Sequence, residues 1–410
     1  MPFRAALSGL NAASSHLQVI GNNVANASTT GFKQSRTEFA DVFAVSNLGS
    51  SADAIGVGVR VANVTQLFSQ GNIEFTENGL DLAINGEGFF RLNDGGSVVY
   101  SRDGAFSVDN QGFIVNNRGH RLVGNLADNA GNITAGVGDL RITTGSIAPQ
   151  ATSNIEIGLN LDTAAAVPAL AFDVNDPSTY NATTSLSVFD SQGNSHLATA
   201  YYRKTATNQW ESHLFIGGTE LTPTAPATGG LTFDVNGVLT APAGGTVAYD
   251  AFTVPGSSGA PLSLTIDYTG GVTSTQFGAP FSVSSLVQDG FSAGELSGID
   301  IAEDGTIQAR FSNGRSRALG QVQLYNFANP QGLRQLGDNT WVETFDSGTP
   351  LPNIPGQGGS GLLQSGALEA SNVDLTEELV AMITAQRNFQ ANAEVITTAD
   401  AITQTIINIR

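Results

Sequence analysis

The chain has 410 residues, enough for about two to four domains, and it is strongly acidic, with 36 acidic against 17 basic residues and a net charge of -19. Such a surface repels nucleic acid and anionic membranes, so the composition argues against both as partners. The absence of cysteine excludes disulfides, thiolate metal sites and a cysteine nucleophile.

The first predicted element is a long amphipathic helix over residues 3–27. Apolar residues recur at every seventh position and again three positions further on, which is the a/d pattern of a coiled coil. Residues 25–27 read A-x-A, as before a signal-peptidase cut, but polar residues interrupt the preceding stretch, so it lacks the apolar core of a signal peptide. The sequence therefore predicts a retained helix. The heptad positions are Phe3, Leu10, Leu17 and Val24, with Ala6, Ala13, Ile20 and Ala27.

A connecting segment, residues 31–70, follows the helix. It contains the polar run SNLGSSAD at 46–53 and several glycines, which allow the backbone to bend. We expect this segment to be an adjustable connection between the helical and β parts of the chain. The candidate hinge residues are Gly31, Gly49, Gly56 and Gly58.

Residues 71–370 are predicted to be β-rich. Short alternating runs are separated by turn pairs such as Asn78-Gly79 and Asp103-Gly104, which are typical of strands joined by hairpins. The stretch LSLTIDY at 262–268 alternates apolar and polar residues with the period of a strand that has one solvated face.

The composition changes within this β region. Residues 146–282 are rich in Ala, Ser, Thr, Pro and Gly, and their only cations are Arg203 and Lys204. We therefore predict an outer β domain, 146–282, inserted into an inner β domain formed by 71–145 and 283–370.

The chain ends in a second predicted helix, from about residue 374 to 409. Its apolar residues follow one another at steps of three and four, and Asp374, Glu377 and Glu378 place negative charge in the first turn, where the helix dipole favours it. The two terminal helices can pair as a parallel or antiparallel coiled coil, either within one chain or between copies. The N-terminal helix has a neutral polar outer face, which favours packing on several sides.

The predicted fold is thus mainly β with long α-helical termini, in which a terminal helical domain, 1–30 and 371–410, joins two nested β domains. The sequence predicts no enzyme, cofactor or metal site. The four histidines are scattered, and P-loop, nucleophile-elbow and H-E-x-x-H motifs are absent.

Both ends of the chain resemble the bacterial flagellar rod and hook family. The N-terminal match is GLNAASSHLQVIGNNVANASTTGFKQSRTEFADVF at 9–43, followed by SQGNIEFTENGLDLAINGEGFF at 69–90 and SRDGAFSVDNQGFIVNNRGHRLVG at 101–124. The C-terminal match is ASNVDLTEELVAMITAQRNFQANAEVITTADAITQTIINIR at 370–410. The segments occur in the family's order and together are highly specific.

This resemblance implies a structural subunit that polymerises into a tube, with the terminal helices lining the inside and the outer β domain at the surface. The insertion at 146–282 favours a hook-type subunit, a flexible universal joint that transmits motor torque, over a distal-rod-type segment, which is shorter. A secreted β-rich adhesin is the alternative hypothesis from another class of protein. It leaves the apolar faces of the two terminal helices without a packing partner.

The resemblance also implies the subunit's location and partners. The chain is expected in the hook of the bacterial flagellum, outside the cell, after passage through the flagellar type III export apparatus without cleavage. Its implied partners are copies of itself, the distal rod protein, the hook cap protein and the hook-filament junction protein.

Packing of the inner layer is assigned to apolar positions of both helices. These predicted subunit-packing residues are Leu10, Leu17, Ile20, Val24, Met382, Phe389, Ile396, Ile402 and Ile406.

Overall fold

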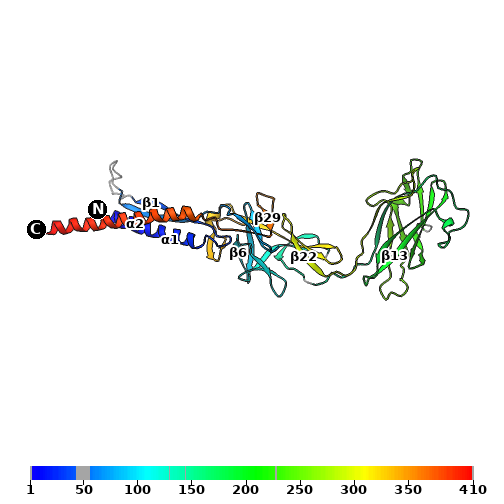
Figure 1. The fold of residues 1–410 in the computed structure, drawn as a ribbon, viewed down its shortest axis with the longest axis horizontal. Coiled ribbons are helices and arrows are strands. Elements are labelled where there is room, and N and C mark those ends of the chain that lie inside the picture. Colours follow the sequence, from blue (N-terminus) through cyan, green and yellow to red (C-terminus); the bar gives the residue numbers. More distant parts are fainter. Residues whose placement is uncertain (1, 43–55, 129, 144, 227–228, 409–410) are drawn as a thin grey trace. The chain divides into compact units, whose positions relative to one another are not determined.

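A computed structural model describes residues 2–42, 56–128, 130–143, 145–226 and 229–408. The chain forms two compact units. The first comprises residues 1–144, 298–310 and 316–410, and the second comprises 145–297 and 311–315. Strands make up most of the regular structure and the two long helices are at the chain ends, which confirms the predicted fold class (Figure 1).

The first unit contains both helices, α1 (Pro2–Ala25) and α2 (Leu375–Asn408). They pack antiparallel, because Asn23 near the end of α1 contacts Glu378 near the start of α2, whereas Gly9 packs against Asn392. The chain's two ends therefore lie at the same end of the helical pair (Figure 1).

The segment after α1 forms a two-stranded hairpin. Strands β1 (Ser35–Val42) and β2 (Gly58–Gln66) pair antiparallel and pack on α1. The rings of His16 and Phe39 meet edge to face with centroids 5.7 Å apart, and the Val59 amide donates to the Ser8 hydroxyl over 3.1 Å. Much of the connecting segment is thus ordered against the helix.

A large sheet forms the β part of the first unit around an aromatic core of Phe89, Tyr100, Tyr325, Phe327 and Trp341. Its main path, in order, is β22 (Leu296–Ile301), β23 (Thr306–Phe311), β24 (Ser316–Val322), β9 (Arg121–Ala127), β5 (Phe89–Asp94), β6 (Ser97–Ser101), β27 (Thr340–Val342) and β26 (Arg334–Gly337). Strands attached to this path are β7 (Phe106–Val108), β8 (Ile114–Asn116), β10 (Ile133–Asp139), β25 (Leu324–Asn326) and β28 (Leu351–Asn353).

Two short ribbons complete the first unit. One pairs β4 (Leu82–Asn85) with β29 (Leu362–Ser365), and the other pairs β3 (Ile73–Phe75) with β30 (Ala367–Glu369). Each ribbon joins a strand from before the second unit to one from after it, so the chain segments that flank the insertion are hydrogen-bonded together.

The second unit consists of two sheets that share one apolar core. The first sheet is β16 (Pro223–Ala225), β19 (Thr246–Tyr249), β20 (Thr265–Asp267), β11 (Asn154–Asn160) and β21 (Ser282–Gln288). The second is β12 (Ala182–Phe189), β13 (Ser195–Ala206), β14 (Gln209–Ile216), β17 (Gly230–Phe233) and β18 (Leu239–Ala241), with β15 (Thr219–Leu221) beside β14. Buried residues of both, including Ile157, Trp210 and Ile266, belong to one cluster.

The second unit extends further along the sequence than the compositional change suggested. Strand β21 pairs antiparallel with β11, and isolated bridges join Ile147 to Gly294 and Gln150 to Phe291. Because these pairings hold the returning strand in the second unit, the unit runs to residue 297, whereas the expected boundary was 282.

Candidate assembly interface

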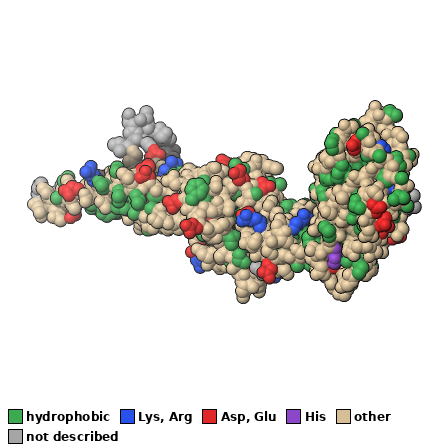
Figure 2. All heavy atoms as spheres, turned by 45° about the vertical axis from the view of Figure 1, so that its right-hand side comes forward, with side chains coloured by type: hydrophobic (Ala, Val, Ile, Leu, Met, Phe, Trp, Pro, Cys, Tyr) green, Lys and Arg blue, Asp and Glu red, His purple; other side chains and the backbone are tan. Residues whose placement is uncertain are grey.

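The helical pair leaves many large apolar side chains exposed. Side chains of this kind lie along the helical part of the molecule in Figure 2. A helix pair whose only role was to join the two ends of one chain would bury most of its apolar surface, so a surface of this extent indicates a further packing partner. The exposed residues are Phe3, Leu7, Leu375, Leu379, Val380, Ile383, Val395, Ile402 and Ile407.

The predicted packing residues differ in their exposure. Ile20 is buried within the chain, at 2% exposed, while Ile402 is 57% exposed. The side chain of Ile406 lies outside the described part of the structure. The remaining predicted residues are half-buried, so each keeps surface available for another contact: Leu10, Leu17, Val24, Met382, Phe389 and Ile396.

Close approach of the two helices depends on small residues. Ala385, a position of the predicted C-terminal apolar stripe, is buried, and so is Ala12, which the heptad pattern did not single out. A side chain at Gly9 would collide with Asn392 of the opposite helix. Exposed residues such as Val380 and Ile383 were also missed, because they lie beside the predicted stripe. The available sequence signal was that turns of α2 carry two neighbouring apolar residues, of which the predicted stripe included only one.

A buried polar cluster joins the end of α1 to the start of α2. Glu378 is buried, and its Oε1 accepts hydrogen bonds from Asn23 Nδ2 over 2.8 Å and Gln34 Nε2 over 2.7 Å. The Asn23 side chain also exchanges two hydrogen bonds with the backbone of Ser35, over 2.8 and 2.9 Å. The two helices and the start of β1 are thus held in one geometry.

A buried ionic triad joins the segment that follows α1 to the strand that precedes α2. Glu369 forms ion pairs with two cations: Lys33 Nζ lies 2.7 Å from its Oε1, and Arg102 Nη1 lies 3.2 Å from its Oε2. The side chains of Lys33 and Glu369 are 0% exposed. Glu369 Oε1 also accepts from the Gly71 amide over 2.9 Å. Burial lowers the pKa of Lys33 and that of Arg102, and in both cases the Glu369 carboxylate opposes this shift.

Both cations of the triad also donate to backbone carbonyls. Lys33 Nζ donates to the Ser69 carbonyl and Arg102 to the Gly86 carbonyl, each over 2.8 Å. Three distant segments, those of Lys33, Gly71 and Arg102, therefore bind the one carboxylate of Glu369. Sequence reasoning missed the triad because its members are far apart in the chain, although the rarity of lysine was a usable signal.

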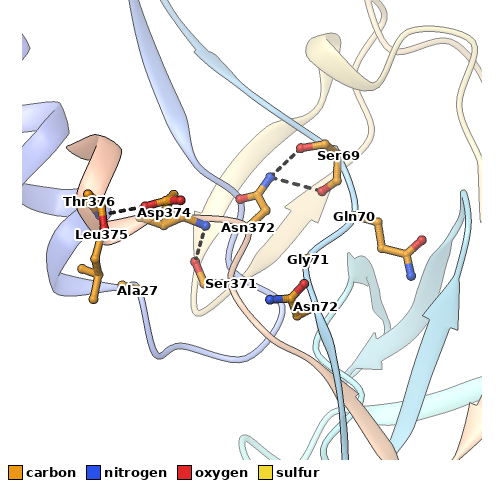
Figure 3. A pocket seen from close by; sticks show the side chains of 11 residues that line it. Ala27, Ser69, Gln70, Gly71, Asn72, Ser371, Asn372, Asp374, Leu375 and Thr376 are labelled. Carbon is orange, nitrogen blue, oxygen red and sulfur yellow. Dashed lines mark hydrogen bonds between the residues drawn. The ribbon is translucent and has the colours of Figure 1, made fainter. Parts of the chain in front are cut away.

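An open cavity of about 460 Å³ lies where the helical pair meets the β ribbons (Figure 3). Asn372 donates to the carbonyl and hydroxyl oxygens of Ser69, and Asp374 caps α2 by accepting from the Thr376 amide over 2.7 Å. These polar groups are occupied in holding the backbone, and no cluster of metal-ligating side chains occurs among the described residues. The cavity is consistent with a structural joint.

The candidate hinge glycines have different environments. Gly31 and Gly58 have positive φ angles, and a side chain at either would collide, at Gly31 with the backbone of Asp103 and at Gly58 with Ser8. A side chain at Gly56 would make only an ordinary contact with the Val42 carbonyl, and Gly49 lies outside the described residues. A role in bending stays a prediction for this segment, and Gly31 and Gly58 additionally serve close packing.

These features define a structural protein built for assembly, with an apolar helical pair fixed onto a β scaffold. Within the described residues, neither helix contains an apolar stretch long enough to cross a membrane. Four family models match the chain: the flagella basal body rod protein at 3–33, the flagellar hook protein FlgE/F/G D1 domain at 83–160, the flagellar basal body protein FlaE D2 domain at 160–291, and the flagellar basal body rod FlgEFG protein C-terminal region at 364–409.

Curated relatives match over the whole length. The chain is 41% identical over 417 residues to the flagellar hook protein FlgE of Salmonella typhimurium, covering 100% of both chains. It is 39% identical over 415 residues to FlgE of Escherichia coli K12, again covering 100% of both. FlgE of Treponema pallidum is 34% identical over 463 residues, with 99% of each chain covered.

The fold agrees with a solved structure. The crystal structure of Helicobacter pylori flagellar hook protein FlgE2 aligns with a TM-score of 0.57 at 14% identity, covering 72% of this chain and 100% of that one. The chain belongs to the flagellar hook protein family, which is a family of structural proteins. The full-length matches to hook proteins confirm the hook-type assignment over the rod and adhesin alternatives.

The triad makes a direct prediction about stability. Replacing Glu369 by Gln preserves its shape but leaves two buried cations uncompensated, so it should lower the free energy of unfolding of the first unit by about 3–5 kcal/mol. The chain's two tryptophans report on different units, Trp341 on the first and Trp210 on the second. Urea unfolding followed by Trp341 fluorescence in a Trp210→Phe background measures the effect.

The exposed pair of Arg36 and Glu38 supplies the control. Glu38→Gln in the same background should cost less than about 1 kcal/mol. Equal effects of the two substitutions would contradict a stabilising role for the buried carboxylate.

Proposed function

We propose that this chain polymerises into the flagellar hook through its terminal helices, which form the inner layer of a flexible tube that transmits torque. The observation that carries the proposal is the exposed apolar surface of the helical pair. Strand pairing closes the ends of the β region within the chain, whereas apolar residues of α1 and α2 remain available to other copies.

The charge distribution supports burial of these helices among copies. Arg4 is the only formally charged side chain between Met1 and Phe32, and α1 has no acidic residue in its first turn or basic residue in its last. A helix without charges on its outer face can be surrounded by identical helices without bringing like charges together. This matters in a chain with a net charge of -19, whose copies otherwise repel one another.

Flexibility is assigned to the connecting segment of residues 31–70. The hairpin of β1 and β2 packs on α1, and the residues that bind Glu369 on either side of it, Lys33 and Gly71, anchor both of its ends to the β scaffold. We place the adjustable part near the hairpin's outer end, where Gly56 is free of the close packing that constrains Gly31 and Gly58. Weak contacts between β units of neighbouring copies would then slide as the tube bends.

The remaining partners follow from the family. A hook subunit requires export by the flagellar type III apparatus, which we propose occurs without cleavage of α1, and assembly beneath a hook cap protein. The ends of the polymer would join the distal rod protein and the hook-filament junction protein.

Phe389→Glu should raise the concentration needed for polymerisation roughly hundredfold or abolish it, since it places an unpaired charge in an apolar contact between helices. Sedimentation and negative-stain electron microscopy of the full-length chain measure this. Gln390→Glu adds the same charge at the adjacent exposed position and should polymerise nearly as the original chain does.

The fold of the Phe389→Glu variant is checked by its Trp341 unfolding transition, which should be retained because that residue lies in the β core. Normal tubes from a folded Phe389→Glu variant would refute packing of this face between copies.

The hinge assignment is tested by deleting residues 46–53. Cells carrying this change should export the chain and build hooks, but hook bending stiffness, measured from the fluctuations of attached filaments, should change. Hooks of unaltered stiffness would argue against an adjustable connection in this segment.

A further inference from the structure

A fully exposed phenylalanine lies in the first unit, outside the two helices. Phe345, in the loop after β27, is 100% exposed, although apolar residues of this size are usually at least partly covered. The exposure is not due to a loose terminus, since the loop connects two strands of the large sheet, β27 and β28.

The loop that presents Phe345 is rigidly built. Ser347 is completely buried, and its hydroxyl accepts from the Thr344 amide over 2.9 Å and donates to the Thr344 carbonyl over 2.9 Å. Thr344 Oγ1 donates to the Gly332 carbonyl over 2.6 Å, and Asn329 Nδ2 donates to the Asp346 carbonyl over 3.0 Å. The backbone on both sides of Phe345 is thus fixed to the neighbouring loop at 329–332.

A rigidly held, exposed aromatic ring has the properties of a binding anchor. Aromatic side chains supply large apolar contact areas and are enriched among the residues that dominate interface energies. Because the backbone is already ordered, little conformational entropy is lost when the ring is covered. We propose that Phe345 is an anchor that packs against a neighbouring copy of this chain in the polymer.

Charge complementarity favours a second copy as the partner. Exposed acidic residues, Glu343 and Asp346, flank the ring, so the surface that receives it should carry cations. The first unit supplies such cations: Arg60, Arg334 and Arg387 are exposed and form no ion pair with any carboxylate in the described part of the chain. The contact lies outside the helical layer and rests on the proposed polymerisation.

Phe345→Ala should raise the critical concentration for polymerisation about tenfold, the factor expected for loss of one moderately strong anchor per subunit. Its unfolding curve should match that of the original chain, since the ring has no intramolecular packing to lose. Val235→Ala, which removes another highly exposed apolar side chain in the second unit, serves as the control and should polymerise normally.

The outcomes separate this proposal from the preceding one. Polymerisation of Phe345→Ala at the original critical concentration would overturn the anchor while leaving helix-driven assembly intact. Failure of the unaltered chain to polymerise would overturn both.

Photocrosslinking identifies the partner directly. Benzoylphenylalanine in place of Phe345 should yield crosslinked dimers of the chain in polymers and none in dilute monomers, and the crosslinked peptide should come from the first unit. Crosslinking exclusively to another flagellar protein in intact hooks, or to solvent alone, would overturn the assignment.

Discussion

The structure of the first unit depends on the buried carboxylate of Glu369. It binds one cation from the segment after α1 and another from the loop after β6, and it belongs to the strand that leads into α2. Desolvated charges are stabilised only while their partners stay in place, so the arrangement tolerates little partial opening. The exit of one helix and the entry of the other are consequently fixed to the same point of the β scaffold.

This constraint explains how two helices from opposite ends of a 410-residue chain can act as one element. The triad fixes the segment after α1 and the strand before α2 to one point, and the cluster of Asn23, Gln34 and Glu378 holds the end of α1 against the start of α2. The apolar faces are then presented together, already aligned, for packing by further copies. We propose that, in a torque-transmitting tube, these buried polar contacts carry force from the helical layer to the β scaffold, while the hairpin and the contacts between subunits allow bending.

Much of this organisation could be predicted from the sequence. Heptad spacing identified both helices to within about two residues, because an apolar stripe must be buried whatever surrounds it. The triad could not be predicted in this way. Lys33, Arg102 and Glu369 are far apart in the sequence and belong to no common motif, so only the tertiary fold brings them together. The boundary near Ser297 was missed because β21 is set by pairing with a distant strand, and composition does not report pairing. Phe345 carries no pattern at all; its exposure is visible only once the loop is folded.

The central claim is that the terminal helices of neighbouring copies pack together as the inner layer of a hook tube. Electron cryomicroscopy of tubes assembled from the full-length chain tests it most directly. The account predicts helical density nearest the tube axis, into which residues 2–25 and 375–408 fit, with apolar residues of α1 and α2 contacting adjacent copies. A map with the β units innermost, or with the helices exposed to solvent and unpacked, would contradict it.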